Sequence, residues 1–332
     1  MIHATEPYIS EMKPALHHSP VNGPFEDPSV YVRVLREKRA FLFDAGDISG
    51  LSARQLLKIT DVFITHTHID HFIGFDTILR ALLKRETPVT FYGPEGIINR
   101  IEGKLSGYTW NLIAEYPLLV NVVEIRNDEI LRASFRANEE FRRNDLDHVE
   151  YAMTVLDGPL LSVNTVLLEH DVPSLGYAIK EKIHINIDKA MLEKRGFTVG
   201  PWLGRLKDLI REGRLDDAVD TGKGELTVRE LTDIYAITEG QKVSYVMDTS
   251  PTDSNIEKII EFVCDSDSLY IEAYFMHRDI DRARDRGHLT ARIAGMIARK
   301  ANVQNLHLLH FSPRYSEEPE ELIKEAMGQF RH

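Results

Sequence analysis

The sequence contains very little cysteine and no long apolar run. Its single cysteine, Cys264, can form no disulfide within the chain, and a zinc site built from cysteines is excluded. No apolar stretch approaches the length of about 20 residues that a helix needs to cross a bilayer. The first twenty residues also lack the basic and apolar regions of a signal peptide. We therefore expect a cytoplasmic protein with no membrane partner.

The chain also has fewer basic residues than acidic ones. The chain has 40 lysines and arginines against 52 aspartates and glutamates, which gives a formal net charge of −12 at pH 7. This balance excludes a surface that is positive throughout, but it leaves room for a local basic patch or arm that binds nucleic acid. The hydrophobic share of 43% and the charged share of 28% are typical of a globular protein.

Apolar patterning predicts strands and helices that alternate in both halves of the chain, which indicates an α/β fold. After an irregular lead-in over residues 1–28, residues 29–35 and 39–44 are expected to form a β-hairpin. The stretch 183–240 breaks the alternation with charged helical segments, and we expect it to be an inserted arm. At 332 residues the chain is within the range of one large domain that carries such an insertion.

Four residues with metal-binding side chains lie within six positions of one loop, directly after the buried strand predicted at 61–65. These residues are His66, His68, Asp70 and His71. Imidazole nitrogens and carboxylate oxygens suit zinc, and alternate positions of an extended turn can direct two histidines at one ion. The next two residues can then face a second ion nearby. The loop predicts a metal site, because a structural coincidence would not place four ligands so close together.

A site with two metals needs further ligands from other parts of the chain. His170, Asp248 and His310 each stand where a predicted strand ends and a loop begins. Singly, each of these residues could be structural. Together with the histidine loop, they form a consistent set of candidate ligands at strand ends.

The ordered series of these residues, together with Asp44 in LFDAG, resembles the motifs of the metallo-β-lactamase superfamily. The resemblance implies a four-layer αβ/βα sandwich over residues 1–332, with the arm inserted at about 183–240. It also implies two zinc ions. By position, His66, His68 and His170 would hold one ion, Asp70, His71 and His310 would hold the other, and Asp248 would bridge them. Asp44 would orient the loop and would not be a ligand.

Two metals at this spacing can lower the pKa of a bridging water, so that hydroxide is available at neutral pH for hydrolysis. Redox relatives of this fold carry glutamate at the position of His68 and favour iron, so histidine here favours zinc. Manganese or iron could substitute for it. The Asp70 carboxylate beside the bridge could in addition move a proton.

Several segments are similar to ribonuclease Z, the tRNA 3′-processing endonuclease, over residues 29–315. They are ITHTHIDHFIGFD, FYGPEGI, EHDVPSLGYAI, GPWLGRLK, GHLTA and LLHFSPRY. The resemblance implies that His288 of GHLTA is catalytic through a charge relay with Asp70 and that Glu272 supports the relay. It also implies an arm that contacts RNA, and a homodimer. Independently of the resemblance, Ser312 and Arg314 could hold a substrate phosphate together with a helix N-terminus. The alternatives are that Arg314 is a solvated loop cation and that the mixed charges of the arm form an ordinary solvated helical face.

Other positions differ from the ribonuclease Z pattern and indicate a divergent paralogue. The bulky residues Ile69, Tyr274 and Leu289 replace expected ones around the metal loop, and we expect them to narrow the cleft. A narrowed cleft would favour a smaller phosphodiester over a folded RNA. The expected substrate is therefore a phosphodiester, either a tRNA 3′-trailer or a related smaller one. The alternatives are a carbonyl-ester hydrolase of the lactonase or thioesterase type on the same metals, and a metal-holding protein without catalysis.

Overall fold

The computed structural model describes residues 15–35 and 37–331, and the expectations for residues 1–14 lie outside this part. The described residues divide into two compact units, which we describe separately. The larger unit holds residues 16–157, 162–180 and 242 onward, and the smaller one includes residues 158–161 and 181–241. No helix in the described ranges is long and apolar enough to cross a membrane.

Nine of the described strands form the first sheet of the larger unit, in the order β1 to β8 with β9 paired to β7. Strands β3, β4, β5 and β6 are parallel to one another, and the strands at both edges are antiparallel to their neighbours. The strands are β1 (Leu16–Pro20), β2 (Val30–Val34), β3 (Ala40–Phe43), β4 (Ile59–Phe63), β5 (Val89–Pro94), β6 (Leu119–Ile125), β7 (Glu129–Arg136), β8 (Arg143–Asp145) and β9 (Val149–Glu150).

The second sheet of the larger unit has the strand order β10-β11-β12-β17-β18-β19 among the described residues. Strands β17, β18 and β19 run parallel, so their carboxyl ends meet at one edge of the sheet. The strands are β10 (Thr154–Asp157), β11 (Leu161–Leu168), β12 (Ser174–Glu181), β17 (Lys242–Val246), β18 (Ser268–Glu272) and β19 (Asn305–Leu309).

The two sheets pack face to face through aromatic side chains. Phe43 and Phe63 of the first sheet lie with ring centroids 6.1 and 5.3 Å from that of Tyr177 of the second. The alternate residues of the same strands, such as Leu42 and Val62, point the other way into a core shared with helices. Each sheet is therefore apolar on both faces, which requires a layer of helices outside it.

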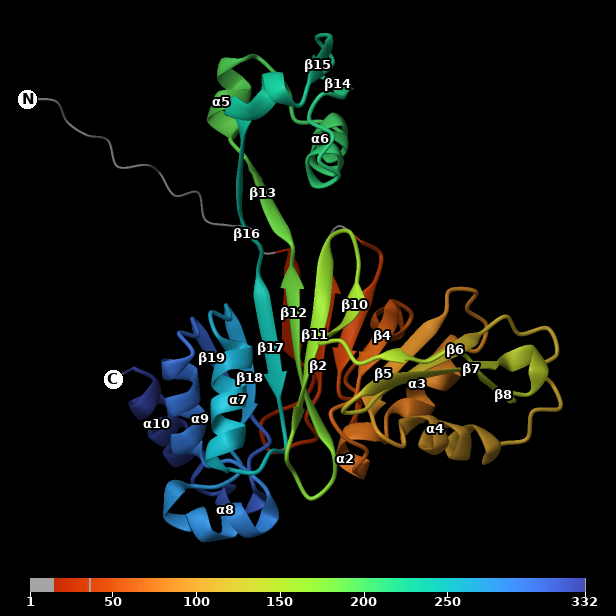
Figure 1. Ribbon diagram of the computed structural model, residues 1–332, viewed down its shortest axis with the longest axis vertical. Helices are drawn as coiled ribbons and strands as arrows, with labels where there is room; N and C mark the ends of the chain where they lie inside the picture. The colour runs from red at the N-terminus through yellow and green to blue at the C-terminus, as the bar shows by residue number, and fades with distance from the viewer. Residues whose placement is uncertain (1–14, 36, 332) are drawn as a thin grey trace, which may run out of the picture. The chain divides into compact units, whose positions relative to one another are not determined.

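Helices cover the outer face of each sheet (Figure 1). On the first sheet these are α3 and α4, and on the second they are α7 and α9, with α10 packed beside α9. This arrangement confirms the four-layer α/β sandwich predicted from the sequence. The helices are α1 (Ala53–Leu56), α2 (Ile69–Phe72), α3 (Phe75–Leu82), α4 (Ile97–Ser106), α7 (Asp253–Val263), α8 (Ile280–Arg286), α9 (Ala291–Lys300) and α10 (Pro319–Phe330).

The smaller unit has its own apolar core, formed by residues such as Leu206, Leu209 and Leu231. A two-stranded ribbon leads into and out of it, with Ile183 paired to Glu239 and Ile187 to Tyr235. The arm predicted at about 183–240 falls within this unit. Its elements are β13 (Ile183–Ile187), α5 (Lys189–Lys194), α6 (Trp202–Arg211), β14 (Ala218–Asp220), β15 (Glu225–Thr227), the 3-10 helix η2 (Arg229–Ile234) and β16 (Tyr235–Glu239).

Two sequence-based expectations need correction. The lead-in over 1–28 is not irregular throughout, because residues 16–20 form β1 and pair with β2. Leu289 does not narrow the cleft, because its side chain is fully buried in the core between α9 and the second sheet. Its apolar side chain belongs to the fold and has no place at the surface of the site.

Candidate metal centre

The predicted ligands all follow strands of the larger unit. His66 and His68 follow β4, His170 follows β11, Asp248 follows β17 and His310 follows β19. Three residues at such strand ends have a backbone conformation in the left-handed region. Their φ angles are 53° at Asp44, 46° at Asp248 and 56° at His310. Residues other than glycine seldom adopt this conformation, and it concentrates at functional sites, where the surrounding structure holds it in place.

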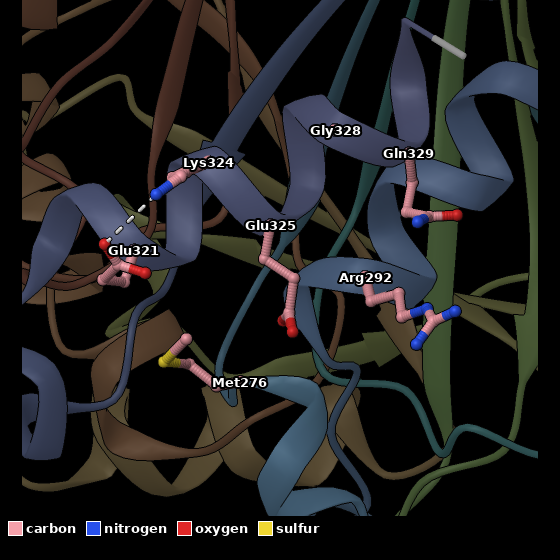
Figure 2. Close-up of a pocket in the computed structure, with 7 residues that line it drawn as sticks. All are labelled: Met276, Arg292, Glu321, Lys324, Glu325, Gly328 and Gln329. Atoms are coloured by element: carbon pink, nitrogen blue, oxygen red, sulfur yellow. Dashed lines mark ion pairs between the residues drawn. The ribbon is translucent and has the colours of Figure 1, made fainter.

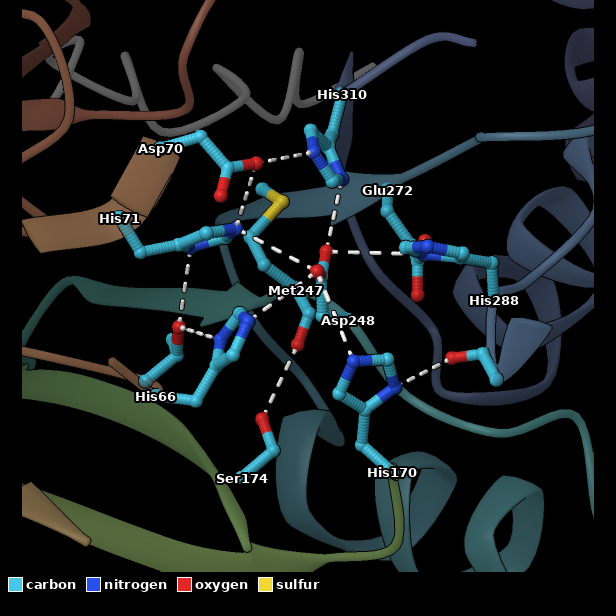
Figure 3. A network of polar contacts seen from close by, with 12 residues as sticks. His66, Asp70, His71, His170, Ser174, Met247, Asp248, Glu272, His288 and His310 are labelled. Atoms are coloured by element: carbon cyan, nitrogen blue, oxygen red, sulfur yellow. Dashed lines mark hydrogen bonds and ion pairs between the residues drawn. The ribbon is translucent and has the colours of Figure 1, made fainter. Parts of the chain in front are cut away.

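The structure brings the seven predicted ligands together in two groups. His66, His68, His170 and Asp248 offer ligand atoms that lie within 4.8 Å of one another, and so do Asp70, His71 and His310. Asp248 connects the groups, because its Oδ2 is 3.4 Å from Nε2 of His66 and 3.4 Å from Nε2 of His71 (Figure 3). A shared carboxylate between two sets of imidazoles is an arrangement that suits a pair of cations.

Four buried polar atoms of this cluster have no hydrogen-bond partner within the described part of the chain. They are Nε2 of His66, Nε2 of His71, Nδ1 of His310 and Oδ1 of Asp248. The last two approach to 2.7 Å without the alignment of a hydrogen bond. Leaving one buried polar group unsatisfied costs about 1–3 kcal/mol. Cations bound by the two groups would satisfy these atoms, so the residues present fit a metal centre.

Asp44 fixes the loop that carries His66 to His71. Its Oδ2 lies 2.8 Å from Nδ1 of His71, and its carboxylate also accepts from the backbone N–H of Thr65 at 2.7 Å and the Tyr245 hydroxyl at 2.9 Å. Because Nδ1 of His71 donates to Asp44, Nε2 is the nitrogen of this ring that faces the cluster. The loop also needs Gly46, since a Cβ there would lie 2.1 Å from the backbone oxygen of Asp70.

His170 is oriented by the chain that precedes His288. Its Nδ1 lies 2.9 Å from the carbonyl oxygen of Gly287 and donates to it, which leaves Nε2 for the cluster. Gly287 ends α8 at a φ of 65°, and a Cβ there would lie 2.7 Å from His170 Nδ1. Sequence reasoning missed this role of Gly287. Only its place before His288 could have indicated it.

Burial and mutual charge set the protonation of the cluster. Burial, with repulsion from His71, lowers the pKa of His66 to about 2, so this ring is neutral and able to bind a metal. Burial raises the pKa of Asp248, but the neighbouring His310 and His71 outweigh it and hold that pKa well below its usual range. Burial likewise raises the pKa of Asp70, and the hydrogen bond from His310 and the charge of His71 reverse this shift. The two carboxylates are therefore ionised and attract cations.

A charge relay is expected between His288 and Asp70, but in the described residues each of them is paired with another side chain. Nδ1 of His288 lies 2.8 Å from Oε2 of the buried Glu272, while Oδ2 of Asp70 lies 3.3 Å from Nε2 of His310. Burial lowers the pKa of His288, but attraction and hydrogen bonding to Glu272 outweigh it, and the pKa is raised. The ring of Tyr274 stacks on the His288 ring with centroids 4.0 Å apart. Glu272 and Tyr274 thus fix the ring at the edge of the cluster.

Ser312 and Arg314 do not contact the cluster ligands through any described hydrogen bond or ion pair. They line a cleft of about 490 Å³ that also has His288 and Tyr274 on its wall. The Ser312 hydroxyl accepts from the backbone N–H of Arg314 at 3.4 Å, at the start of the short helix η4 (Pro313–Tyr315). The structure therefore places both residues beside the candidate proton donor.

A second hollow, of about 440 Å³, lies at α9 and α10 (Figure 2). Its wall includes the charged residues Arg292, Glu321, Lys324 and Glu325, with opposite charges in equal number. None of the predicted ligands lines it. We assign it no part in the site.

The chain is similar to known proteins over most of its length. The profile of the metallo-beta-lactamase superfamily matches residues 23–105. Ribonuclease Z of Brevibacillus brevis is 30% identical over 320 residues, which cover 90% of this chain and 85% of that protein. Ribonuclease BN of Proteus mirabilis is 31% identical over 321 residues, with 91% and 90% covered. The crystal structure of human tRNase Z, short form, shares the fold with a TM-score of 0.53 at 19% identity, over 90% of this chain and 93% of that one.

Proposed function

The chain belongs to the ribonuclease Z family of the metallo-β-lactamase superfamily, and from this membership we propose that it is a two-zinc phosphodiesterase that cleaves RNA. The observation that carries the proposal is the pair of ligand groups joined by Asp248, with unsatisfied buried atoms in both. Precursor tRNA with a 3′-extension is the leading substrate, because relatives named ribonuclease Z and ribonuclease BN cover most of the chain.

The residues that would hold the cations are those of the two groups. His66, His68 and His170 would hold one, and Asp70, His71 and His310 the other, with Asp248 shared. Zinc suits imidazole and carboxylate ligands, and manganese or iron could take its place. When bound, the two cations would lower the pKa of a water molecule and polarise the phosphoryl oxygens.

His288 is the proposed proton donor to the leaving oxygen. It is the one histidine of the cluster region whose Nδ1 is engaged by a glutamate, and its ring lies on the wall of the adjoining cleft. The buried Glu272 is itself held by the backbone N–H of Thr249 at 2.8 Å, so the pair has a fixed direction. A proton on the other ring nitrogen can then pass to a departing oxygen in the cleft.

Asp70 is the second candidate for proton movement. Its side chain is 36% exposed, whereas that of Asp248 is 3% exposed, so it is the carboxylate of the cluster that solvent reaches. We propose that it binds a cation and exchanges a proton with the nucleophilic water. The same family membership leads us to propose a homodimer in the cytoplasm, and light scattering after gel filtration tests the mass.

Hydrolysis of two substrates tests the function. Purified protein with its metals bound should cleave bis(p-nitrophenyl) phosphate and a 3′-extended precursor tRNA. Replacement of His288 by alanine should lower kcat on the precursor by about 10²–10⁴-fold, the usual contribution of a general acid, and should leave the metal content unchanged. The control is His148→Ala, since His148 is exposed and lies outside the cluster.

The outcomes separate phosphodiesterase from ester hydrolase. Activity on neither phosphodiester with metal bound would refute the proposal. Turnover of lactones or thioesters that is indifferent to His288→Ala would favour the carbonyl-ester alternative. A chain that binds no zinc, even after zinc is added, would favour a role without metal catalysis.

A further inference from the structure

The cleft beside His288 is rich in arginine. It is about 490 Å³ in volume, far more than the roughly 30 Å³ that a water molecule occupies in the liquid. We call it the arginine cleft. Its wall consists of Tyr274, Phe275, Arg282, Asp285, Arg286, His288, Ser312 and Arg314.

Its three arginines are not neutralised by ion pairs. No carboxylate in residues 15–35 or 37–331 lies within 4.0 Å of the guanidinium groups of Arg282, Arg286 and Arg314. Two arginines of the same segment that do not line the cleft are paired, Arg278 with Glu318 at 3.4 Å and Arg284 with Asp281 at 3.5 Å. The three cleft arginines thus have no ion-pair partner among the described residues, although the net charge of the chain is −12.

Helix geometry explains this division. Arg282 and Arg286 are four positions apart on α8 and share one face of the helix, while Arg284 lies between them and points to another side. Two like charges at this spacing repel each other and destabilise an isolated helix slightly. A site that must attract an anion gives a physical reason for such a pair.

The ligand that this chemistry fits is a phosphate. A guanidinium group presents parallel N–H donors that match the oxygens of a phosphate, and such charged hydrogen bonds are stronger than neutral ones. The scissile phosphate must lie at the metal cluster, so an anion in the arginine cleft is a different group. Because His288 forms part of the cleft wall and is the proposed donor to the leaving oxygen, that group is on the leaving side of the substrate.

We propose that the arginine cleft binds a second phosphate, carried by the nucleotide that leaves. The inference rests on the proposed function and adds to it the residues that bind a phosphate next to the scissile one. Asp285 lies on the same wall and opposes the charge of the arginines. It limits the affinity for this phosphate.

Three dinucleotides test the proposal: diuridine with one internal phosphate, the same molecule with an added 5′-phosphate, and the same with an added 3′-phosphate. Product analysis identifies which nucleotide leaves. The phosphate on that nucleotide should raise kcat/KM at least about tenfold, as expected for charge-assisted hydrogen bonds, and the phosphate on the other nucleotide should not.

Variants show which residues cause the rise in kcat/KM that the added phosphate produces. R282Q/R286Q should reduce the ratio of the two kcat/KM values toward one, and D285N should increase it. R284Q is the matched control, because it removes a charge from the same helix outside the cleft, and it should keep the wild-type ratio. Calorimetry should show weaker binding of uridine 5′-monophosphate, and no change for uridine, in R282Q/R286Q.

The result that overturns the inference is hydrolysis of all three dinucleotides at equal kcat/KM, or a phosphate gain that persists in R282Q/R286Q. Failure of the proposed function is a different result. In that case no dinucleotide and no bis(p-nitrophenyl) phosphate is hydrolysed while the metals are bound, and the inference falls with it.

Discussion

At the scale of single residues, Asp44 supports the candidate centre without being a predicted ligand. It accepts from His71, Thr65 and Tyr245, and it is fully buried on backbone with positive φ. A carboxylate in this position fixes both the tautomer of His71 and the course of the loop. The contribution of Asp44 is therefore best measured as the change in metal affinity when it is replaced.

Replacing Asp44 by asparagine should weaken metal binding about 10–100-fold, because the variant keeps the volume but loses the charged acceptor for His71. Competition with a chromogenic chelator measures this change. Asp61→Asn is the control, since Asp61 is also a buried aspartate of the first sheet and bonds to Thr60 and Tyr92. Equal affinity in Asp44→Asn and the wild type would contradict the orienting role.

The lowered pKa of His18 predicts that the folded state loses stability in acid. Burial, with repulsion from His307, lowers its pKa from 6.5 to about 4, and its Nδ1 lies 2.8 Å from the Tyr270 hydroxyl. The unfolded chain binds more protons than the folded one between these values, so this stability is present above pH 6.5 and is lost as the pH falls toward 4.

Thermal unfolding against pH checks this prediction. His18→Gln should flatten the fall of Tm between pH 6.5 and 4, whereas replacement of the exposed His148 should not. An unchanged slope in His18→Gln would show that other groups cause the acid loss.

The candidate ligands could be predicted from the sequence because each is a histidine or aspartate at the end of an apolar strand. For His288, the resemblance implied a relay with Asp70 supported by Glu272, but not which carboxylate its ring contacts. Whether its Nδ1 meets Asp70 or Glu272 depends on how β18 and α8 pack, and only the structure places Glu272 at 2.8 Å. The unpaired state of Arg282 and Arg286 depends in the same way on tertiary contacts.

At the scale of elements, α8 connects the candidate proton donor to the candidate ligands. Its end residue Gly287 has positive φ, accepts from His170 and precedes His288. The sequence did not predict this helix, because IDRARDR has one buried residue, Ala283, and no apolar periodicity. The polar edge strand β1 was missed for the same reason.

Gly287→Ala should lower the free energy of unfolding by about 1–2 kcal/mol through the left-handed backbone alone, and should also weaken metal binding by displacing His170. Denaturant unfolding and chelator competition measure the two effects. The control Gly103→Ala lies in α4, where a Cβ would meet nothing within 4 Å, and it should stabilise the chain by about 0.5–1 kcal/mol. Wild-type metal affinity in Gly287→Ala would contradict the contact to His170.

The ion pairs of the arm bear on the predicted RNA contact. Residues 183–240 hold nine basic and eleven acidic side chains. Arg195 and Arg229 are paired with Asp233 and Asp216 within this segment. General attraction of phosphate to the arm is therefore weak, and any RNA contact must depend on a few positions. Composition already indicated this balance, but the pairing itself required the structure.

At the scale of the whole molecule, every predicted site residue belongs to the larger unit. The fold could be predicted because the strand-end motifs resemble those of a known superfamily. The strand pairing within the smaller unit could not, because β13 and β16 pair across nearly fifty residues of intervening chain. Such a long-range pair leaves no local signal.

Deletion of residues 183–239 tests the independence of the larger unit. The backbone N–H of Glu181 donates to the carbonyl of Gln241 at 2.9 Å, so Lys182 and Gly240 can be joined as a two-residue turn. The shortened chain should fold, bind its metals and hydrolyse bis(p-nitrophenyl) phosphate as the full chain does, with a raised KM for precursor tRNA. Loss of the metals on deletion would contradict the division into units.

The central claim is that Asp248 joins two cation sites, and zinc stoichiometry tests it most directly. Metal-free protein titrated with zinc and followed by calorimetry, with mass-spectrometric metal analysis of the product, should bind two ions per chain. Asp248→Ala should weaken both. Binding of one ion or none by the intact wild-type chain, or an Asp248→Ala variant that still holds two with unchanged affinity, would contradict the account.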